Sequence, residues 1–432
     1  MKNHSDVGII GCGPAGAVAG ALLAARGYSV AIFDRDRHPR HHIGESLLPA
    51  SMGILESIGM SAAWMQAHHQ PKFGARFFDP VVNRMETFSF ASRDAGAVPP
   101  AFNVLREEFD QQLCDLAQRK GCAMYANCNI TAVTEDTAPV RINTATGDAH
   151  SCDFLIDASG GAAMLAKKLG HRDMIPDFGR LAVYNYFADF PFADLTDPLE
   201  RQYFTMHLID DGWIWLIPLH NGSISIGAVL KREAVRKNMN PREQFGAAVA
   251  QSPLLQERLR NARALSEYRV AGDYSYHCGQ RFGSHYVLIG DAAGFLDPIF
   301  SSGVHLAVSS AARVVEAVEA VLQHGNHAAL AVYQTEMEAG TGVFQAFVGR
   351  FYQRDLVRNL FFAANQNVML RKAIIDILAG HVWDRSNPLI PSLHRNAAEA
   401  NAVEAAIADK LVDEYRAAIR TDSAAAPLVR EA

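Results

Sequence analysis

The order of apolar and polar positions predicts a strand, a helix and a second strand at the start of the chain. Residues 6–10 form a short β-prone run, residues 15–26 are rich in small residues compatible with a helix, and residues 28–33 are again β-prone. Glycines occupy the turn between the first strand and the helix. Together the three segments predict a βαβ unit with two parallel strands.

The rest of the chain divides into a mixed region and a helical region. Residues 48–68 favour helix, and residues 106–120 place apolar side chains at helical spacing. Strand-like patterns are expected in the segments 73–104, 130–157, 181–274 and 286–289. After about residue 325, alanine, glutamate, glutamine and arginine dominate, which favours helix.

Composition and charge exclude several classes of protein. The chain of 432 residues is 49% hydrophobic and 20% charged, which is typical of a globular enzyme. A net charge of −6 provides no basic field for nucleic acid. We expect no membrane span, because no stretch free of glycine approaches about 20 apolar residues. The six cysteines form no CxxC pair and no Cys/His cluster, so we expect reduced thiols, no metal and a cytoplasmic location.

The turn after the first strand carries a dinucleotide-binding pattern. Residues 11–16 (GCGPAG) match GxGxxG, in which Gly11 permits the tight turn, Gly13 lets the backbone approach a pyrophosphate and Gly16 lets the helix pack on the strand. The helix N-terminus supplies free N–H groups for the phosphates. Asp34 ends the second strand, where an acid binds the adenosine ribose. A purely structural glycine turn would leave Asp34 unexplained, so we predict a dinucleotide site.

Two later segments favour FAD over NAD. Residues 157–160 (DASG) and 290–294 (GDAAG) each follow a predicted strand, and both resemble flavoprotein monooxygenases of the hydroxybenzoate hydroxylase type. The resemblance implies that Asp291 touches the ribityl–pyrophosphate region of FAD and that Arg106 contacts FAD. The alternative for Arg106 is a solvated arginine at a helix end.

The predicted fold class is therefore α/β. It comprises a Rossmann-like FAD-binding domain of the monooxygenase type, an inserted β-sheet on the substrate side and a helical C-terminal region. We expect the FAD-binding domain to span residues 1–325, interleaved with the inserted sheet at about 73–104 and 175–275, and the helical region to span 326–432.

Three segments are similar to flavin-dependent halogenases, and the similarity extends over roughly residues 5–360. Residues 43–49 (IGESLLP) resemble a Gly-Glu-Ser loop that flavin reductases of the geranylgeranyl type share. Residues 213–218 (WIWLIP) fit the halogenase pattern WxWxIP, and residues 295–303 (FLDPIFSSG) fit FxxPxxSxG. The alternative for residues 213–218 is an ordinary core strand, and the alternative for residues 295–303 is a loop that caps a helix beginning near Val304.

The halogenase resemblance implies a set of site residues. Backbone N–H groups of Ser302 and Gly303 would hold chloride or bromide at a helix N-terminus. The FAD-binding residues would be Gly11, Gly13, Pro14, Ala15, Gly16, Asp34, Arg35, Glu45, Ser46, Arg106, Asp291, Pro298 and Gly303. The structural motif along an internal tunnel would be Trp213, Trp215, Ile217 and Pro218.

Lys72 is the predicted catalytic residue. Residues 70–75 (QPKFGA) resemble the segment that carries the halogenase lysine. In that family, reduced FAD and O₂ convert halide to hypohalous acid, which reaches the lysine through the tunnel and is held by hydrogen bonding or as a haloamine. Burial would lower the pKa of the amine enough to make it a nucleophile. The alternative is a surface lysine in a loop. His68, His69 and Glu45 are loose candidates for a general base, with structural roles favoured.

The same resemblance indicates partners and substrates. Because no second GxGxxG follows, we expect a separate NAD(P)H-dependent flavin reductase. The size of the C-terminal region resembles halogenases that act on carrier-bound pyrroles, phenols or acyl groups. Arg350, Arg354 and Arg358 would form one basic stripe on a helix, either a docking site for an acidic carrier protein or a solvated face. Aromatic residues in this region would line a substrate pocket or fill the core, namely Phe344, Phe347, Phe351, Tyr352, Phe361 and Phe362.

The leading hypothesis is an FADH₂-dependent halogenase acting on an electron-rich aromatic compound, free or bound to a carrier protein. The first alternative is a related FAD-dependent monooxygenase or a geranylgeranyl-reductase-like flavin oxidoreductase. A flavin-binding sensor without turnover is the third class. Direct oxidation of NAD(P)H distinguishes the first alternative, and halide-independent FAD binding distinguishes the sensor.

Overall fold

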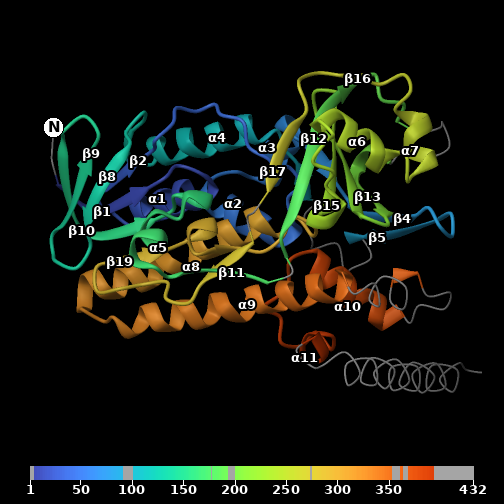
Figure 1. Cartoon of the computed structure of the whole chain (residues 1–432). Coiled ribbons are helices and arrows are strands. Elements are labelled where there is room, and N and C mark those ends of the chain that lie inside the picture. Colours follow the sequence, from blue (N-terminus) through green and yellow to red (C-terminus); the bar gives the residue numbers. More distant parts are fainter. Residues whose placement is uncertain are drawn as a thin grey trace, which may run out of the picture.

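The computed structural model describes residues 4–90, 101–176, 178–192, 200–272, 275–352, 361–362 and 368–393. Two large β-sheets lie side by side, and long helices run beneath them (Figure 1). The predicted α/β fold class is confirmed, including the second sheet and the helical region after residue 325. The exact domain boundaries stay a prediction.

The first sheet contains the predicted βαβ unit, which is confirmed. Its strands are, in order across the sheet, β7 (Ala123–Tyr125), β2 (Val30–Phe33), β1 (His4–Ile10), β10 (Ala149–Asp157), β9 (Val140–Thr144) and β8 (Ile130–Thr134), with β19 (Tyr286–Leu288) also paired to β10. Strands β7, β2, β1, β10 and β19 run parallel. Helix α1 (Pro14–Ala25) packs between α4 (Arg106–Arg119) and α8 (Ser302–His324). The carboxyl ends of β1, β10 and β19 therefore carry residues 11–16, 157–160 and 290–294 to one edge of the sheet.

The second sheet is mainly antiparallel. Its strands are, in order, β16 (Arg263–Ala264), β12 (Arg180–Ala188), β15 (Ile224–Lys231), β14 (Gly212–Pro218), β13 (Tyr203–Ile209), β4 (Gly74–Asp79) and β5 (Arg84–Ser89), with β17 (Arg269–Gly272) also paired to β12. Only the β13–β4 pair within it is parallel. Residues that lie far apart in the sequence thus form one sheet. Its place on the substrate side stays a prediction.

One part of the strand-like prediction for residues 181–274 was wrong. Helices α6 (Pro241–Val249) and α7 (Pro253–Arg258) interrupt this stretch and cover one face of the sheet. Asn240 accepts a hydrogen bond from the backbone of Glu243 while the Glu243 carboxylate accepts one from Asn240, which is a capping box. Pro241 occupies the first helical position, where its missing N–H does no harm.

Short elements join the two sheets. They are the pair β3 (Gln70–Lys72) and β6 (Ala101–Asn103), the three-stranded sheet β11 (Arg172–Met174), β18 (Tyr276–Cys278) and β20 (Gly294–Phe295), the helices α2 (Met52–Ile58), α3 (Ala62–His68) and α5 (Met164–Leu169), and the 3₁₀ turns 49–51, 160–162, 200–202, 232–234 and 290–292. The helix predicted over 48–68 is thus divided, because Gly59 adopts φ +115° and ends α2.

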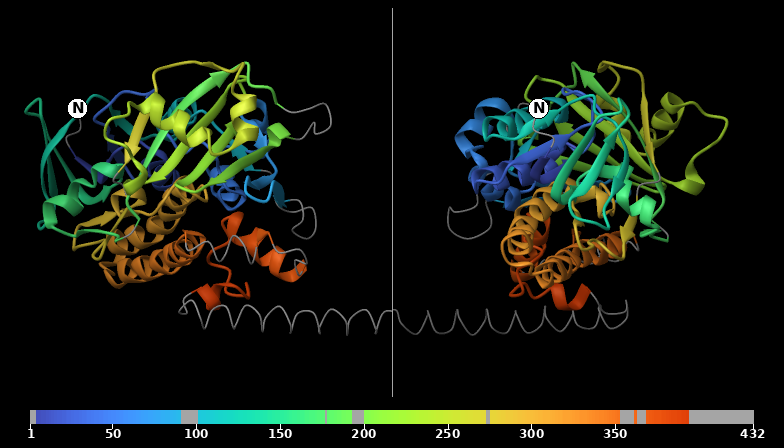
Figure 2. Two further views of the ribbon diagram at one scale, coloured as in Figure 1. Left: turned by 45° about the vertical axis from the view of Figure 1, so that its right-hand side comes forward. Right: turned by 90° about the vertical axis from the view of Figure 1, so that its left-hand side faces the viewer.

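The C-terminal helices form a layer beneath both sheets (Figure 2). Helix α9 (Ala328–Tyr352) packs along α8, and α10 (Val368–Leu378) and α11 (Ile390–Leu393) follow it. Side chains of α9 and α10 share a hydrophobic core with the second sheet. Phe361, which lies between these two helices in the chain, belongs to the same core, and its ring centroid lies 4.7 Å from that of Phe77. Among the described helices we find no candidate membrane span.

The centre of the second sheet tolerates no side chain at Gly227. This glycine of β15 lies opposite both Trp215 and Tyr184, and a Cβ would overlap the Trp215 ring. We therefore expect Gly227→Ala to lower the free energy of unfolding by about 1–3 kcal/mol, measured by urea denaturation. Gly246→Ala is the control, since a Cβ there meets no atom within 4 Å and alanine favours helix α6. Equal losses in both variants would contradict this packing.

Candidate active site

Glycines shape the turn between β1 and α1. Gly11 has φ +99°, and a Cβ there would collide with the carbonyl oxygen of Ala158. A Cβ on Gly16 would collide with the carbonyl oxygen of Gly11, so turn and helix pack too closely for side chains. Pro14 and Ala15 open the helix and are buried. A Cβ on Gly13, by contrast, would meet no atom within 4 Å, so there is open space beside the residue that precedes α1.

Asp34 lies at the end of β2 beside this turn. Its carboxylate accepts hydrogen bonds from the backbone N–H groups of Cys12 at 2.7 Å and Asp36 at 2.9 Å, and His38 Nε2 lies 3.6 Å away. Burial opposes ionisation of Asp34, but these partners outweigh it and lower its pKa. Burial also acts against a charge on His38, yet the nearby carboxylate of Asp34 raises the pKa of His38 to about 9. Sequence reasoning missed His38. Arg35 is exposed and pairs with Asp36, and its contact with FAD stays a prediction.

Arg106 is buried at the start of α4, so the solvated alternative was wrong. Its guanidinium donates two hydrogen bonds to Asp110, at 2.8 and 2.9 Å, and one to the carbonyl of Ile43 at 2.6 Å. Burial raises the pKa of Asp291 to about 6 and that of Glu45 to about 7, and the positive charge of Arg106 opposes both shifts. The structure therefore brings these three predicted residues into one electrostatic cluster.

The segment around Glu45 and Ser46 lies against β6. Glu45 accepts from the N–H of Val104 at 2.7 Å through its backbone, and Ser46 forms a β-bridge with Asn103. Within the part of the chain that the structure describes, Glu45 Oε1, Ser46 Oγ and Asn103 Oδ1 are buried without a hydrogen-bond partner. A buried polar atom without a partner costs about 1–3 kcal/mol. Each of these three side chains therefore has a buried atom that could form a hydrogen bond with a bound polar group.

Lys72 ends β3 and is buried, so the surface-lysine alternative was wrong. Its side chain is 1% exposed, and Nζ donates to the carbonyl oxygen of Leu47 at 2.9 Å. The rings of Phe90 and Phe204 lie 5.5 and 5.8 Å from Nζ. Among the described residues no carboxylate oxygen lies within 4 Å of it. Burial therefore lowers the pKa of Lys72 to about 7.

The loop of residues 297–303 leads into α8. Asp297 accepts from the N–H of Ile299 at 3.0 Å, and Ser301 adopts φ +58°. The helix begins at Ser302, earlier than the predicted Val304, and Ser302 is 2% exposed. A left-handed residue followed by helical ones points successive N–H groups to one side, which is an arrangement that binds anions. Pro298 lies in this loop and Gly303 in the first turn of α8, and a Cβ on Gly303 would lie 3.2 Å from the Phe295 ring.

One hydrogen bond links the Glu45 segment to this helix. Ser51 Oγ lies 3.0 Å from Nδ1 of His305, which is buried in the first turns of α8. Burial lowers the pKa of His305 to about 3, so the imidazole stays neutral. Sequence reasoning found neither residue, because the two segments are far apart in the chain.

The tryptophan motif lies in β14, at the centre of the second sheet. Trp213, Trp215, Ile217 and Pro218 belong to this strand, and the first three are core residues, as the core-strand interpretation expects. Trp215 Nε1 donates to Ser225 Oγ at 3.1 Å, and Asn103 Nδ2 donates to the carbonyl of Pro218 at 3.2 Å. A role along a tunnel stays a prediction.

The remaining candidates have mainly structural surroundings. His68 is exposed and stacks on Trp64 at 4.2 Å, and His69 is buried, with Nε2 3.0 Å from Gln112 Oε1. Arg350 is 7% exposed, so it does not belong to a solvated stripe, and Arg354 and Arg358 lie outside the described residues. The predicted aromatic residues Phe344, Phe347, Phe351 and Phe361 are core residues, with Tyr352 and Phe362 packed against them.

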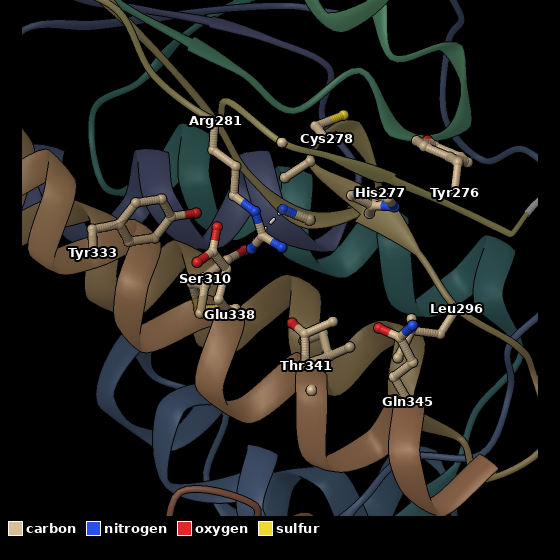
Figure 3. A pocket seen from close by; sticks show the side chains of 17 residues that line it. Tyr276, His277, Cys278, Arg281, Leu296, Ser310, Tyr333, Glu338, Thr341 and Gln345 are labelled. Atoms are coloured by element: carbon tan, nitrogen blue, oxygen red, sulfur yellow. Dashed lines mark hydrogen bonds between the residues drawn. The ribbon is translucent and has the colours of Figure 1, made fainter. Parts of the chain in front are cut away.

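Two cavities have neither Lys72 nor Ser302 in their lining. The larger, of about 320 Å³, lies between the strands β18 and β20 and the helices α8 and α9; Figure 3 shows Arg281, Ser310 and Glu338 on its wall. It reaches Gly290, next to Asp291. The smaller, of about 90 Å³, lies where the β13–β14 turn meets the end of α9 and is lined in part by Tyr352.

Known proteins share both the sequence and this architecture. The flavin-dependent halogenase gsfI of Penicillium aethiopicum is 32% identical over 345 residues, which is 73% of this chain and 64% of that protein. The 1H-pyrrole-2-carbonyl-[peptidyl-carrier protein] chlorinase of Pseudomonas fluorescens is 30% identical over 89% of this chain and 91% of its own length. The solved structure of the flavin-dependent brominase Bmp2 has a TM-score of 0.81 at 26% identity and covers 93% of this chain and 100% of that one.

The family model described as tryptophan halogenase matches residues 6–95 and 80–379. These matches include the glycine turn, Lys72, the tryptophan motif and the loop before α8. The chain therefore belongs to the tryptophan halogenase family of flavin-dependent enzymes.

Proposed function

We propose that this protein is an FADH₂-dependent halogenase. It uses chloride or bromide and O₂ to form hypohalous acid and, through Lys72, halogenates an electron-rich aromatic compound such as a phenol or a pyrrole. The observation that carries the proposal is the buried amine of Lys72, which contacts a backbone carbonyl but no carboxylate within 4 Å among the described residues. A stability role alone does not explain a buried cation left without a counter-charge.

The residues around the glycine turn fit FAD. The open space at Gly13 accepts a pyrophosphate against the start of α1, and the ionised Asp34 is placed to bind ribose hydroxyls. The unpartnered atoms of Glu45, Ser46 and Asn103 offer hydrogen bonds to a further polar group. When bound and reduced, FAD supplies the electrons for the reduction of O₂ that oxidises the halide.

The loop before α8 fits a small anion. The N–H groups of Ser302 and Gly303 are at the positive end of a 23-residue helix, and the left-handed Ser301 turns them toward one side. We assign the halide to these two N–H groups.

Lys72 can hold the oxidised halogen in two ways. The ammonium can donate a hydrogen bond to hypohalous acid, or the neutral amine can attack the halogen, forming an N–halogen bond and releasing water. Transfer to an aromatic carbon then restores the amine as the ring loses a proton. A pKa of about 7 makes both protonation states accessible near neutral pH.

The substrate class follows from the chemistry and from the relatives. Electrophilic halogen reacts with electron-rich rings, and the Pseudomonas chlorinase is named for a pyrrole bound to a carrier protein. We propose a phenol or pyrrole, free or carrier-bound, with reduced FAD supplied by a separate NAD(P)H-dependent reductase in the cytoplasm. Rapid FAD reduction by NADPH alone would instead support the monooxygenase or reductase alternative.

Gly13 tests the cofactor site separately from the fold. Gly13→Ala adds only a Cβ, which enters open space at the helix start, so the apoprotein should unfold at a nearly unchanged urea concentration. The same side chain should weaken FAD binding by about tenfold or more, measured by fluorescence titration, because it occupies the predicted pyrophosphate position. Unchanged FAD affinity would place the cofactor elsewhere.

Lys72 tests the halogenation step. With reduced FAD, O₂ and bromide, Lys72→Ala should lower bromination of a phenol or pyrrole probe by more than about a hundredfold. Hypobromite, captured by a diketone trap, should form at the wild-type rate. Lys167→Ala is the matched control, because Lys167 is exposed on α5 and should lose nothing. Absence of hypobromite from the wild type would contradict the proposed function itself.

Burial of Lys72 also predicts a pH dependence of stability. The ordinary pKa of 10.5 holds in the unfolded chain, and about 7 holds in the fold. Between these values the unfolded chain binds more protons, so stability rises with pH from about 7 upward. Lys72→Met removes the buried cation, and we expect its stabilising effect to be about 3 kcal/mol larger near pH 6 than near pH 9 in urea denaturation, because about two pKa units are involved at about 1.4 kcal/mol each. An equal effect at both pH values would show that Lys72 keeps its ordinary pKa.

A further inference from the structure

The hydroxyl of Tyr352 joins three parts of the molecule at one point. Tyr352 is the last residue of α9, and its hydroxyl lies 3.0 Å from each carboxylate oxygen of Asp297. The same oxygen accepts a hydrogen bond from Trp213 Nε1 at 3.0 Å. The guanidinium of Arg180 lies 3.4 Å from the centre of the Tyr352 ring, and its Nε lies 3.9 Å from Asp297.

This cluster is buried, and its carboxylate, Asp297, is the first residue of the loop 297–303 that leads into α8. Asp297 is 0% exposed and Trp213 is 1% exposed. Oδ1 of Asp297 accepts from the backbone N–H of Ile299 as well as from Tyr352, so the carboxylate holds the start of the turn that leads to Ser302. Within the described ranges, the positive charge that pairs with Asp297 is Arg180, whose Nε lies 3.9 Å from Oδ2, which is longer than a hydrogen bond. The Tyr352 hydroxyl is therefore the main side-chain donor that fixes this carboxylate.

The loop fixed in this way carries a strained residue. Ser301 is left-handed without being glycine, a conformation that persists only when its surroundings impose it. Asp297 anchors the loop on one side of Ser301, and helix α8 anchors it on the other. Loss of the Tyr352 hydroxyl would leave Trp213 Nε1 without an acceptor and would free the Asp297 side chain to move.

We infer that Tyr352 is a positioning residue that holds the anion-binding loop 297–303 in its binding conformation, through Asp297, and couples this loop to the Trp213 strand and the end of α9. The inference rests on the proposed function, because it takes the anion of this loop to be the halide. Tyr352 touches neither halide nor substrate in this role. Tyr352 keeps the loop in one ordered conformation, and the affinity for halide depends on that conformation.

The test compares two tyrosine-to-phenylalanine variants on one helix. Tyr352→Phe removes the hydroxyl that contacts Asp297. Tyr333→Phe is the matched control, since Tyr333 is a buried residue of α9 whose hydroxyl donates to the carbonyl of Leu288 at 3.0 Å, away from the loop. Halide binding to the FAD-loaded, oxidised enzyme is measured by chlorine NMR line broadening, and hypobromite formation is measured against bromide concentration.

We expect Tyr352→Phe to raise both the halide dissociation constant and the half-saturating bromide concentration by about tenfold, the effect of losing one hydrogen bond to a charged group. The rate at saturating bromide and the FAD affinity should change by less than about threefold. Tyr333→Phe should shift none of these quantities. If Tyr352 had only a packing role, its replacement would lower the amount of folded enzyme, but the folded fraction would keep both its halide affinity and its rate at saturating bromide.

A second variant covers the case in which Tyr352→Phe does not fold. Arg180→Lys keeps the positive charge but loses the planar group that covers the Tyr352 ring, so it should raise the half-saturating bromide concentration in the same direction. The inference is overturned if the folded variants bind halide like the wild type, or if Tyr333→Phe shifts affinity equally. If the activity of the wild type does not depend on halide, the proposed function is overturned. If the wild type depends on halide but Tyr352→Phe has the same halide affinity, only the inference about Tyr352 is overturned.

Discussion

The backbone of residues 43–47 is the connection on which the rest of the site depends. It receives a hydrogen bond from Arg106 at the carbonyl of Ile43 and one from Lys72 at the carbonyl of Leu47. It also pairs with β6 through the N–H of Leu47 and the carbonyl of Glu45. Arg106 begins helix α4, which packs on α1, and Lys72 leads into the second sheet, so a displacement of this one segment would move both together.

The two cations that contact this segment differ in their charge partners. Arg106 is fully paired with Asp110, and its charge reaches Asp291 and Glu45, whose own ionisation burial opposes. Lys72 has aromatic and backbone neighbours, and burial lowers its pKa to about 7. The fold thus keeps a permanent positive charge near the predicted nucleotide site and a titratable amine beyond it. That separation follows from residue type, because an arginine cannot give up its proton in a protein.

Local sequence was sufficient for the features that depend on local geometry. The turn at Gly11, the helix after Gly13 and the acid at Asp34 follow from spacing along one βαβ unit, and each was predicted correctly in position. The capping box at Asn240 also depends on local sequence and predicts a helix start, but it was missed because the surrounding stretch was predicted to be strand-like. For Asp34, Ser302 and Gly303, the predicted binding of FAD or halide remains to be tested.

Burial and pairing depend on distant segments and could not be predicted in this way. Lys72 is enclosed by Phe90, Phe204 and the β6 strand, and nothing near residue 72 indicates these neighbours. Tyr352 was predicted only as an aromatic side chain, because its contacts with Asp297 and Trp213 require the end of α9 to lie beside β14. Arg350 was predicted on a basic stripe, but packing of α9 against the core buries it.

The isolated buried amine of Lys72 has a consequence for protein engineering. Any apolar side chain of similar length avoids the desolvation that lysine suffers at this position, so a screen that rewards heat resistance alone will favour replacement of residue 72. Stabilised libraries of this enzyme would then be enriched in variants lacking the proposed halogen carrier. A screen for thermostability needs to hold residue 72 constant, or to select for halogenated product in the same round.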